Sequence, residues 1–188
     1  ACETHLGEIS IQSFGPENGP VVIAIHGMSS AVLHEWDACA QACAEAGFRV
    51  LLPNFHSNPR TAPGLALGVG EDDVMKILVT AISAHSKEPV ILMGKSWGGA
   101  VAAKFAQRHP DMVRQLVLIC PALSDAAVAK DLRMPLLLMW AKDDWITWFS
   151  GTKVYQENCP KLTLQVAERG GHRILPHYLQ PLLSFVET

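Results

Sequence analysis

The stretch Gly94-Lys95-Ser96-Trp97-Gly98 has the pattern Gly-x-Ser-x-Gly, which suits nucleophilic chemistry. A serine hydroxyl is a poor nucleophile until a base removes its proton, and it must stand clear of its surroundings to attack. A sharp turn from a strand into a helix exposes the hydroxyl, and glycines two residues to either side remove clashing side chains. The apolar run 89–93 precedes the motif and a helical stretch, 97–109, follows it. Ser96 is therefore the predicted nucleophile; the alternative is a glycine-rich turn that only joins a strand to a helix.

The elements that must position this serine alternate along the chain. Short apolar runs predict strands at 21–25, 48–52, 89–93, 115–120, 135–140 and 162–166, and segment 8–14 alternates as an antiparallel edge strand would. Longer segments predict helices at 35–46, 71–85, 97–109, 125–132, 147–158 and 176–186.

The central runs are apolar at nearly every position, so both faces of these strands are expected to be buried, as in a parallel sheet covered by helices. We therefore predict an α/β fold: a three-layer sandwich in which a mostly parallel sheet of about seven strands carries helices on both faces. No internal repeat or linker interrupts the sequence, so residues 1–188 are expected to form a single domain. In such a sheet, the functional loops lie beyond the carboxyl ends of the strands.

With its strand, Gly-x-Ser-x-Gly motif and helix in that order, the sequence resembles the α/β-hydrolase superfamily, and the resemblance extends from His26 to His172. It implies that an acid and then a histidine follow the serine along the chain. Asp144 comes after the run 135–140 and aligns with the acid, while its neighbour Asp143 stays open as an alternative.

His172 aligns with the histidine of the family, because it follows two glycines just after the last predicted strand. The resemblance assigns it the role of general base, with the acid fixing its tautomer. The resemblance also covers Ile25-His26-Gly27-Met28, whose family counterpart lends a backbone N–H to an oxyanion hole. Met28 is the expected donor and Ser29 the alternative, and the N–H of Trp97 is the expected second donor. His26 itself is expected to be structural.

The segments that connect the predicted strands around the site leave little room for a covering domain. Only residues 121–134 separate two predicted strands where many relatives carry a cap, so we expect a lidless member with no cap domain. The long loop 54–70 is expected to overhang the site as a flap or as a solvated loop. Trp145, Trp148 and His56 are the candidate pocket residues, with core packing as the alternative for the tryptophans.

Composition excludes several other classes of protein. Fifteen Lys and Arg against 18 Asp and Glu give a formal charge of −3, which disfavours a nucleic-acid partner. No apolar run approaches the roughly 18 residues that span a bilayer, so no membrane association is expected. The polar segment 1–7 does not have the pattern of a signal peptide, although removal of a leader stays open because the chain lacks an initial Met. Five cysteines without a C-x-x-C motif favour reduced thiols and a cytoplasmic location.

Together these features predict a serine hydrolase that cleaves a small ester or thioester through an acyl-enzyme. The expected partner is a small acyl substrate, no cofactor or metal is required, and a monomer is plausible. One alternative is a partner-binding protein built on the same fold. Another is a peptidase or acyltransferase that uses the same three residues.

Overall fold

The computed structural model describes residues 1–64 and 68–188. The strands are β1 (Cys2–Thr4), β2 (Gly7–Phe14), β3 (Val21–Ile25), β4 (Arg49–Asn54), β5 (Val90–Lys95), β6 (Val113–Ile119), β7 (Leu136–Ala141) and β8 (Leu162–Ala167). The α-helices are α1 (Asp37–Glu45), α2 (Glu71–His85), α3 (Trp97–Arg108), α4 (Ala126–Ala129), α5 (Thr152–Asn158) and α6 (Leu179–Val186).

The eight strands of the described residues form one sheet in the order β1-β2-β4-β3-β5-β6-β7-β8. Every neighbouring pair from β4 to β8 is parallel, whereas β2 runs antiparallel to β4, as its alternating sequence predicts. The expectation of a mostly parallel sheet of about seven strands is confirmed, with one more strand among the described residues than the sequence pattern marks. The strand that the sequence did not predict is β1, which has only three residues and pairs with β2 through a tight turn. Three residues are too few to show the alternation of apolar and polar side chains that marks a strand.

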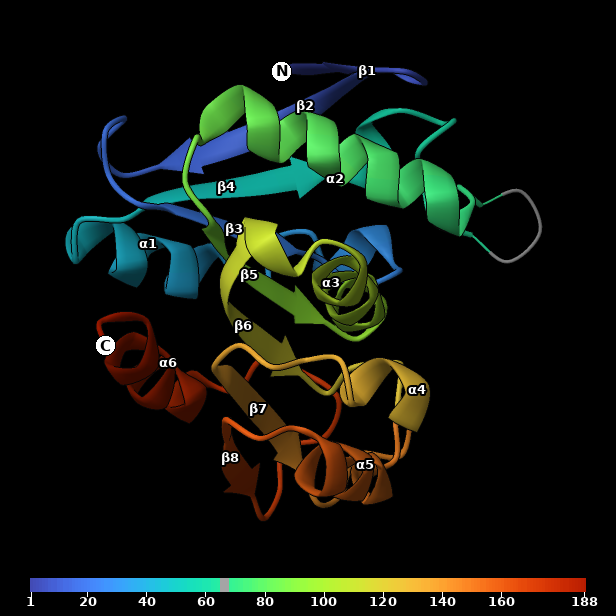
Figure 1. Cartoon of the computed structure of the whole chain (residues 1–188), viewed down its shortest axis with the longest axis vertical. Helices are drawn as coiled ribbons and strands as arrows, with labels where there is room; N and C mark the ends of the chain where they lie inside the picture. Colours follow the sequence, from blue (N-terminus) through green and yellow to red (C-terminus); the bar gives the residue numbers. More distant parts are fainter. Residues whose placement is uncertain (65–67) are drawn as a thin grey trace.

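Helices cover both faces of the sheet, which confirms the three-layer sandwich (Figure 1). Helix α1 packs against α6 on one face, and α2, α3, α4 and α5 contact one another in turn on the other. The strands β3, β5 and β7 are buried at every position, as the uninterrupted apolar runs predict. Between β6 and β7, a stretch that lies wholly within the described residues, the only helix is α4, so no cap domain is inserted at this point.

The predicted helix 147–158 begins later than expected. Its first residues form a turn, followed by a short 3₁₀ turn at Phe149–Gly151 and then by α5. Asp144 Oδ1 accepts the N–H groups of Ile146 and Thr147, so these residues form a turn on the Asp144 side chain ahead of the 3₁₀ turn.

The five cysteines are free and buried. Burial raises the pKa of Cys39 to about 12 and that of Cys43 to about 11, so these neighbours on α1 act as small apolar side chains. Among the described residues no helix is both long enough and apolar enough to cross a bilayer. The cytoplasmic location stays a prediction. So does the flap in loop 54–70, of which residues 65–67 lie outside the described part of the chain.

Candidate active site

Ser96 stands at the sharp turn between β5 and α3. Its backbone has φ 57° and ψ −116°, a conformation that strains any residue with a side chain. The turn is tight enough that a Cβ on Gly94 would overlap the carbonyl oxygen of Gly98, and a Cβ on Gly98 would overlap that of Ile25. The two glycines of the motif are therefore required by the close approach of backbone to backbone, as the sequence pattern predicts.

The structure brings Ser96, Asp144 and His172 together from the carboxyl ends of three strands. His172 Nε2 lies 2.8 Å from Ser96 Oγ, and His172 Nδ1 lies 2.9 Å from Asp144 Oδ2. The side chain of Asp144 is fully buried, and that of His172 is 15% exposed. One imidazole thus bridges a hydroxyl and a carboxylate. This geometry can transfer a proton from the hydroxyl while the carboxylate stabilises the charged ring.

The two neighbouring aspartates make different contacts. Asp144 Oδ1 accepts N–H bonds from Ile146 at 3.0 Å and from Thr147 at 2.9 Å, which leaves Oδ2 for His172. Asp143 instead accepts the N–H of Gly171 at 2.9 Å and that of Gly170 at 3.2 Å, and these bonds lower the pKa of its carboxyl. Asp143 therefore holds the loop that carries His172, and Asp144 contacts the imidazole itself.

His26 controls the peptide that precedes Met28. The N–H of Phe55 donates to His26 Nε2 at 3.1 Å, so Nε2 bears the lone pair and Nδ1 bears the proton. His26 Nδ1 then donates to the carbonyl oxygen of Gly27 at 2.6 Å. Burial lowers the pKa of His26, which keeps the ring neutral. Because a peptide is planar, fixing the Gly27 carbonyl also fixes the direction of the Met28 N–H.

His56 lies against this same loop, with Nε2 2.8 Å from the carbonyl oxygen of Met28. Its ring stacks on His26 at a centroid distance of 5.1 Å, and His26 in turn stacks on Trp97 at 6.0 Å. The imidazole predicted to face a substrate group thus has a partner within the protein. Within the described residues, the N–H groups of Met28 and Trp97 donate to no protein acceptor.

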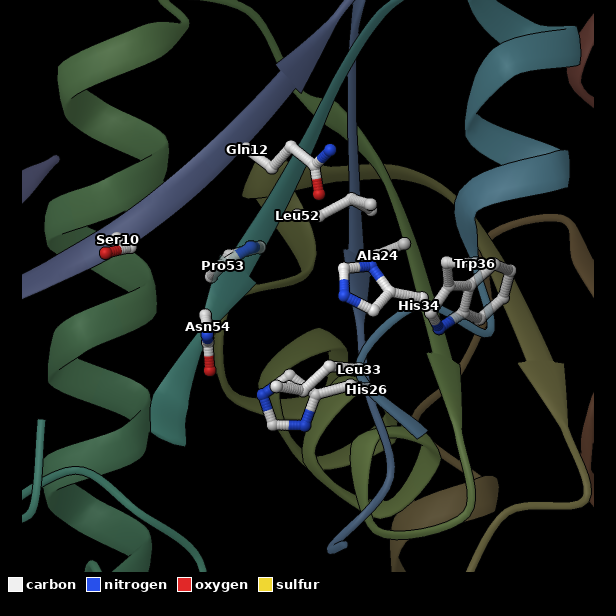
Figure 2. Close-up of a pocket in the computed structure, with 10 residues that line it drawn as sticks. All are labelled: Ser10, Gln12, Ala24, His26, Leu33, His34, Trp36, Leu52, Pro53 and Asn54. Carbon is white, nitrogen blue, oxygen red and sulfur yellow. The ribbon is translucent and has the colours of Figure 1, made fainter. Parts of the chain in front are cut away.

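The other two candidate pocket residues, Trp145 and Trp148, are 76% and 74% exposed, so core packing does not explain them. Trp148 lines an open hollow of about 470 Å³ at the ends of β6 and β7. A different cavity, of about 230 Å³, lies beside His26 between β2, β4 and segment 33–36 (Figure 2). Neither Ser96 nor His172 lines that cavity.

A buried ion pair lies next to the turn and was not anticipated from the sequence. Lys95 Nζ lies 3.2 Å from Glu35 Oε2, with side-chain exposures of 4% and 16%. Glu35 Oε1 also accepts the N–H of Ile174 at 2.8 Å, two residues beyond His172. One carboxylate therefore joins the turn at Ser96 to the loop of His172. The sequence feature that could have predicted this pair is Lys95 itself, which ends an apolar strand. A buried ammonium needs a counter-ion, so an acidic partner could have been expected.

Within the described residues, a single group of side chains has donor atoms close enough together to hold a metal ion: Cys120, Asp144 and His172. Two of the three are already hydrogen-bonded to each other. Burial raises the pKa of the Cys120 thiol, which disfavours the thiolate that a metal would require. The closeness of these three side chains is therefore better explained by the hydrogen bonds of Asp144 and His172 than by a metal site.

Comparison with known proteins places the chain in the α/β-hydrolase family. A family model described as "alpha/beta hydrolase fold" matches residues 20–132. The AB hydrolase superfamily protein YfhM of Bacillus subtilis is 25% identical over 146 residues, which are 75% of this chain and 49% of that protein. Lipase LipV of Mycobacterium tuberculosis is 27% identical over 117 residues, covering 62% of this chain and 43% of the lipase. The chain thus spans about half the length of the curated relatives it matches.

Among solved structures, the esterase EaEST of Exiguobacterium antarcticum superposes with a TM-score of 0.83. The match covers 100% of this chain and 98% of the esterase at 15% identity. At that identity the likeness shows the shared fold alone.

Proposed function

The chain belongs to the α/β-hydrolase family, and from this premise we propose that it is a serine hydrolase cleaving a small ester or thioester. Ser96 is the nucleophile, His172 the general base and Asp144 the acid. The observation that carries the proposal is the pair of short contacts at His172, 2.8 Å to Ser96 Oγ and 2.9 Å to Asp144 Oδ2. A protein that only binds a partner has no need of a hydroxyl aligned with a base and strained clear of its neighbours.

The reaction begins when Ser96 Oγ attacks the substrate carbonyl and His172 Nε2 takes the hydroxyl proton. Asp144 stabilises the imidazolium that forms, and the Asp144 contact keeps Nδ1 protonated throughout. When the tetrahedral intermediate collapses, the carbon–oxygen or carbon–sulfur bond breaks and His172 returns the proton to the leaving group. Water, deprotonated by the same imidazole, then attacks the acyl-serine; the bond from the acyl carbon to Ser96 Oγ breaks, His172 returns the proton to Oγ, and the acid is released.

The negative charge on the substrate oxygen requires donors that are not already in use. The N–H groups of Met28 and Trp97, which donate to no acceptor among the described residues, are available to meet that need. Gly27 brings the first donor close, since a Cβ at that position would lie 3.8 Å from Ser96 Cβ. Each such donor typically lowers the barrier by about 3 kcal/mol. His26 and His56 act as positioning residues, because they hold the two peptides around the first donor.

The test is labelling with a fluorophosphonate together with hydrolysis of small aryl esters and thioesters. The wild-type protein should label and turn over, and Ser96→Ala should lose the label and at least about 10⁴-fold in kcat with an unchanged melting temperature. Adding amine and alcohol acceptors to the assay distinguishes hydrolase from acyltransferase, and an amide series tests peptidase activity. Retention of wild-type turnover by Ser96→Ala would contradict the proposal. A well-folded wild type that neither labels nor turns over would favour the partner-binding alternative.

A further inference from the structure

The cavity beside His26 has a volume of about 230 Å³ (Figure 2). We call it the His26 cavity. The residues that line it are Ser10, Gln12, Ala24, His26, Leu33, His34, Trp36, Leu52, Pro53 and Asn54. Because a cavity of about 150 Å³ can hold benzene, this volume is sufficient for a benzene ring with a small polar substituent.

Strand pairing places one wall of the cavity on a single face of the sheet. Across β2 and β4, Ser10 pairs with Asn54 and Gln12 pairs with Leu52. Side chains two residues apart on a strand point to the same face, and directly paired residues share that face. The four side chains therefore form one continuous surface, which Figure 2 shows beside the segment of Trp36.

The floor of the cavity is apolar. Trp36 and Leu52 are 2% and 7% exposed. The indole N–H of Trp36 already donates to the carbonyl oxygen of Ile25 at 3.1 Å, so its ring presents carbon to the cavity. A ligand with an apolar body can cover this floor and displace water from it.

Hydrogen-bonding groups stand above this floor. Ser10 and Gln12 are exposed and Asn54 is half-buried, so a small molecule can reach all three from solvent. Within the described residues, the Ser10 hydroxyl, the Gln12 amide and Asn54 Nδ2 form no hydrogen bond. A carboxamide or a hydroxyl group on the ligand would find both donors and acceptors here.

The cavity offers no counter-ion to a charged ligand. None of its described lining residues carries a carboxylate, an ammonium or a guanidinium group. Burial lowers the pKa of His26, so its ring is neutral, and His34 already pairs with Asp37 at 3.1 Å. An ionised ligand would lose hydration without gaining a partner, which favours an uncharged one.

Two residues of the cavity wall hold the loop of Met28. His26 Nδ1 donates to the carbonyl oxygen of Gly27 at 2.6 Å. Asn54 Oδ1 accepts the N–H of His56 at 2.9 Å, and His56 Nε2 lies 2.8 Å from the carbonyl oxygen of Met28. A ligand resting on this wall would therefore restrain the two peptides that flank the Met28 N–H.

From these contacts we propose that the His26 cavity is an effector site, which binds a small uncharged molecule with a carboxamide or hydroxyl group on an apolar body. A ligand stabilises the arrangement that it binds, here the one in which His26 and Asn54 fix the loop of Met28. The Met28 N–H is the proposed oxyanion donor, and such donors act on the transition state. Binding should therefore raise kcat at least about twofold and leave KM within about twofold.

The experiment uses benzamide as the probe and follows the indole N–H signals of the wild-type protein by ¹⁵N NMR. The Trp36 signal should shift on addition of benzamide, whereas that of Trp145, 76% exposed on the loop after β7, should not. Benzoate and benzylammonium have similar size but carry a charge, and they should bind at least about tenfold more weakly. Hydrolysis of p-nitrophenyl acetate with and without saturating benzamide measures the change in kcat and KM.

Two variants block the cavity and one is their control. Ser10→Phe and Gln12→Phe each fill the cavity from β2, and each should abolish both the Trp36 shift and the rise in kcat. The matched control is Ser13→Phe on the same strand. Ser13 is exposed and pairs with Leu51 on the opposite face of the sheet, so this variant should retain both effects.

A wild-type Trp36 signal that does not move at benzamide concentrations up to its solubility would overturn the binding site. So would a shift that persists in both blocking variants, or equal binding of the charged analogues. A shifted signal with unchanged kcat, or a rise in KM of the kind a competitor for Ser96 causes, would overturn the effector role. The NMR measurement does not depend on the reaction, so failure of the proposed function is seen separately, as absence of labelling and turnover in the wild type.

Discussion

Replacing Glu35 by Gln tests the role of the ion pair beneath the site. The change keeps the size of the side chain, and the amide oxygen can still accept the N–H of Ile174, which lies 2.8 Å from Glu35 Oε1. What disappears is the charge facing Lys95, whose side chain is only 4% exposed. The variant therefore isolates the effect of an uncompensated ammonium at the base of the turn that holds Ser96.

The expected magnitude follows from burial. Removing one partner of a buried ion pair typically destabilises a protein by 3–5 kcal/mol, because the remaining charge has lost its hydration. Glu35 retains 16% exposure, so water can reach part of the site and the lower end applies. We expect a loss of about 3 kcal/mol in the free energy of unfolding, equivalent to a fall of about 6–12 °C in melting temperature for a chain of this size.

Urea unfolding and thermal melting followed by circular dichroism measure the loss directly. Two controls define its cause. Glu157→Gln breaks an exposed pair with Lys153, 3.8 Å apart, and should change stability by less than about 0.5 kcal/mol. Combining Glu35→Gln with Lys95→Met removes both charges and should recover most of the loss. A single variant within 1 kcal/mol of wild type, or a double variant no better than the single one, would refute the buried-charge reasoning.

Three further predictions follow from the contacts around the turn and its loops. Asp144→Asn should lower kcat on a small aryl ester by about 10⁴-fold, whereas Asp143→Asn should lower it by less than about tenfold. Similar losses in the two variants would contradict the different roles inferred from the contacts of the two carboxylates. Gly98→Ala should lower the free energy of unfolding by more than about 2 kcal/mol, because its Cβ overlaps a backbone carbonyl. Gly70→Ala, at the N-cap of α2 with only a carboxylate oxygen 3.6 Å away, should cost less than about 1 kcal/mol in a thermal melt. His26 has a pKa below its unfolded value of about 6.5, so its contribution to stability is complete above that pH and is lost as the pH falls below it. Measured by urea unfolding between pH 5 and 8, the free energy of unfolding should therefore fall by up to about 1.4 kcal/mol per pH unit below pH 6.5. The variant His26→Gln should not show this dependence, and an unchanged slope in the variant would assign it to another group.

Much of the fold could be predicted because its signals are local. Helix α2 spans Glu71–His85, the bounds that its periodicity predicts, and the fully apolar runs became buried parallel strands. The turn at Ser96 follows from two glycines at fixed offsets, since a Cβ at Gly94 near the end of β5 or at Gly98 near the start of α3 would overlap a backbone carbonyl. The sequence order of serine, acid and histidine selects Ser96 and His172 and limits the acid to Asp143 or Asp144, and the structure brings Ser96, His172 and Asp144 within hydrogen-bonding distance.

Other features depend on contacts between segments far apart in the chain, which local patterns do not report. The choice between Asp143 and Asp144 is one example, because neighbouring side chains in a turn point in different directions and only the fold decides which meets His172. The pairing of Lys95 with Glu35 is another, since 60 residues separate them in the sequence. His56 likewise showed no sign of binding Met28, because that contact depends on how the loop after β4 folds over the loop after β3.

These long-range contacts explain how a site without a cap can still be well organised. The sheet supplies the starting points of the loops, but a catalytic array requires positions accurate to about 0.5 Å. Asp143 and Glu35 supply that accuracy for His172, by holding its loop from two sides through backbone N–H groups. A covering domain would exclude water and add substrate contacts, yet it is not needed to align the three residues. The alignment instead depends on two carboxylates outside the array, so a variant that removes either acceptor completely, such as Asp143→Ala, should misplace His172 before it unfolds the sheet.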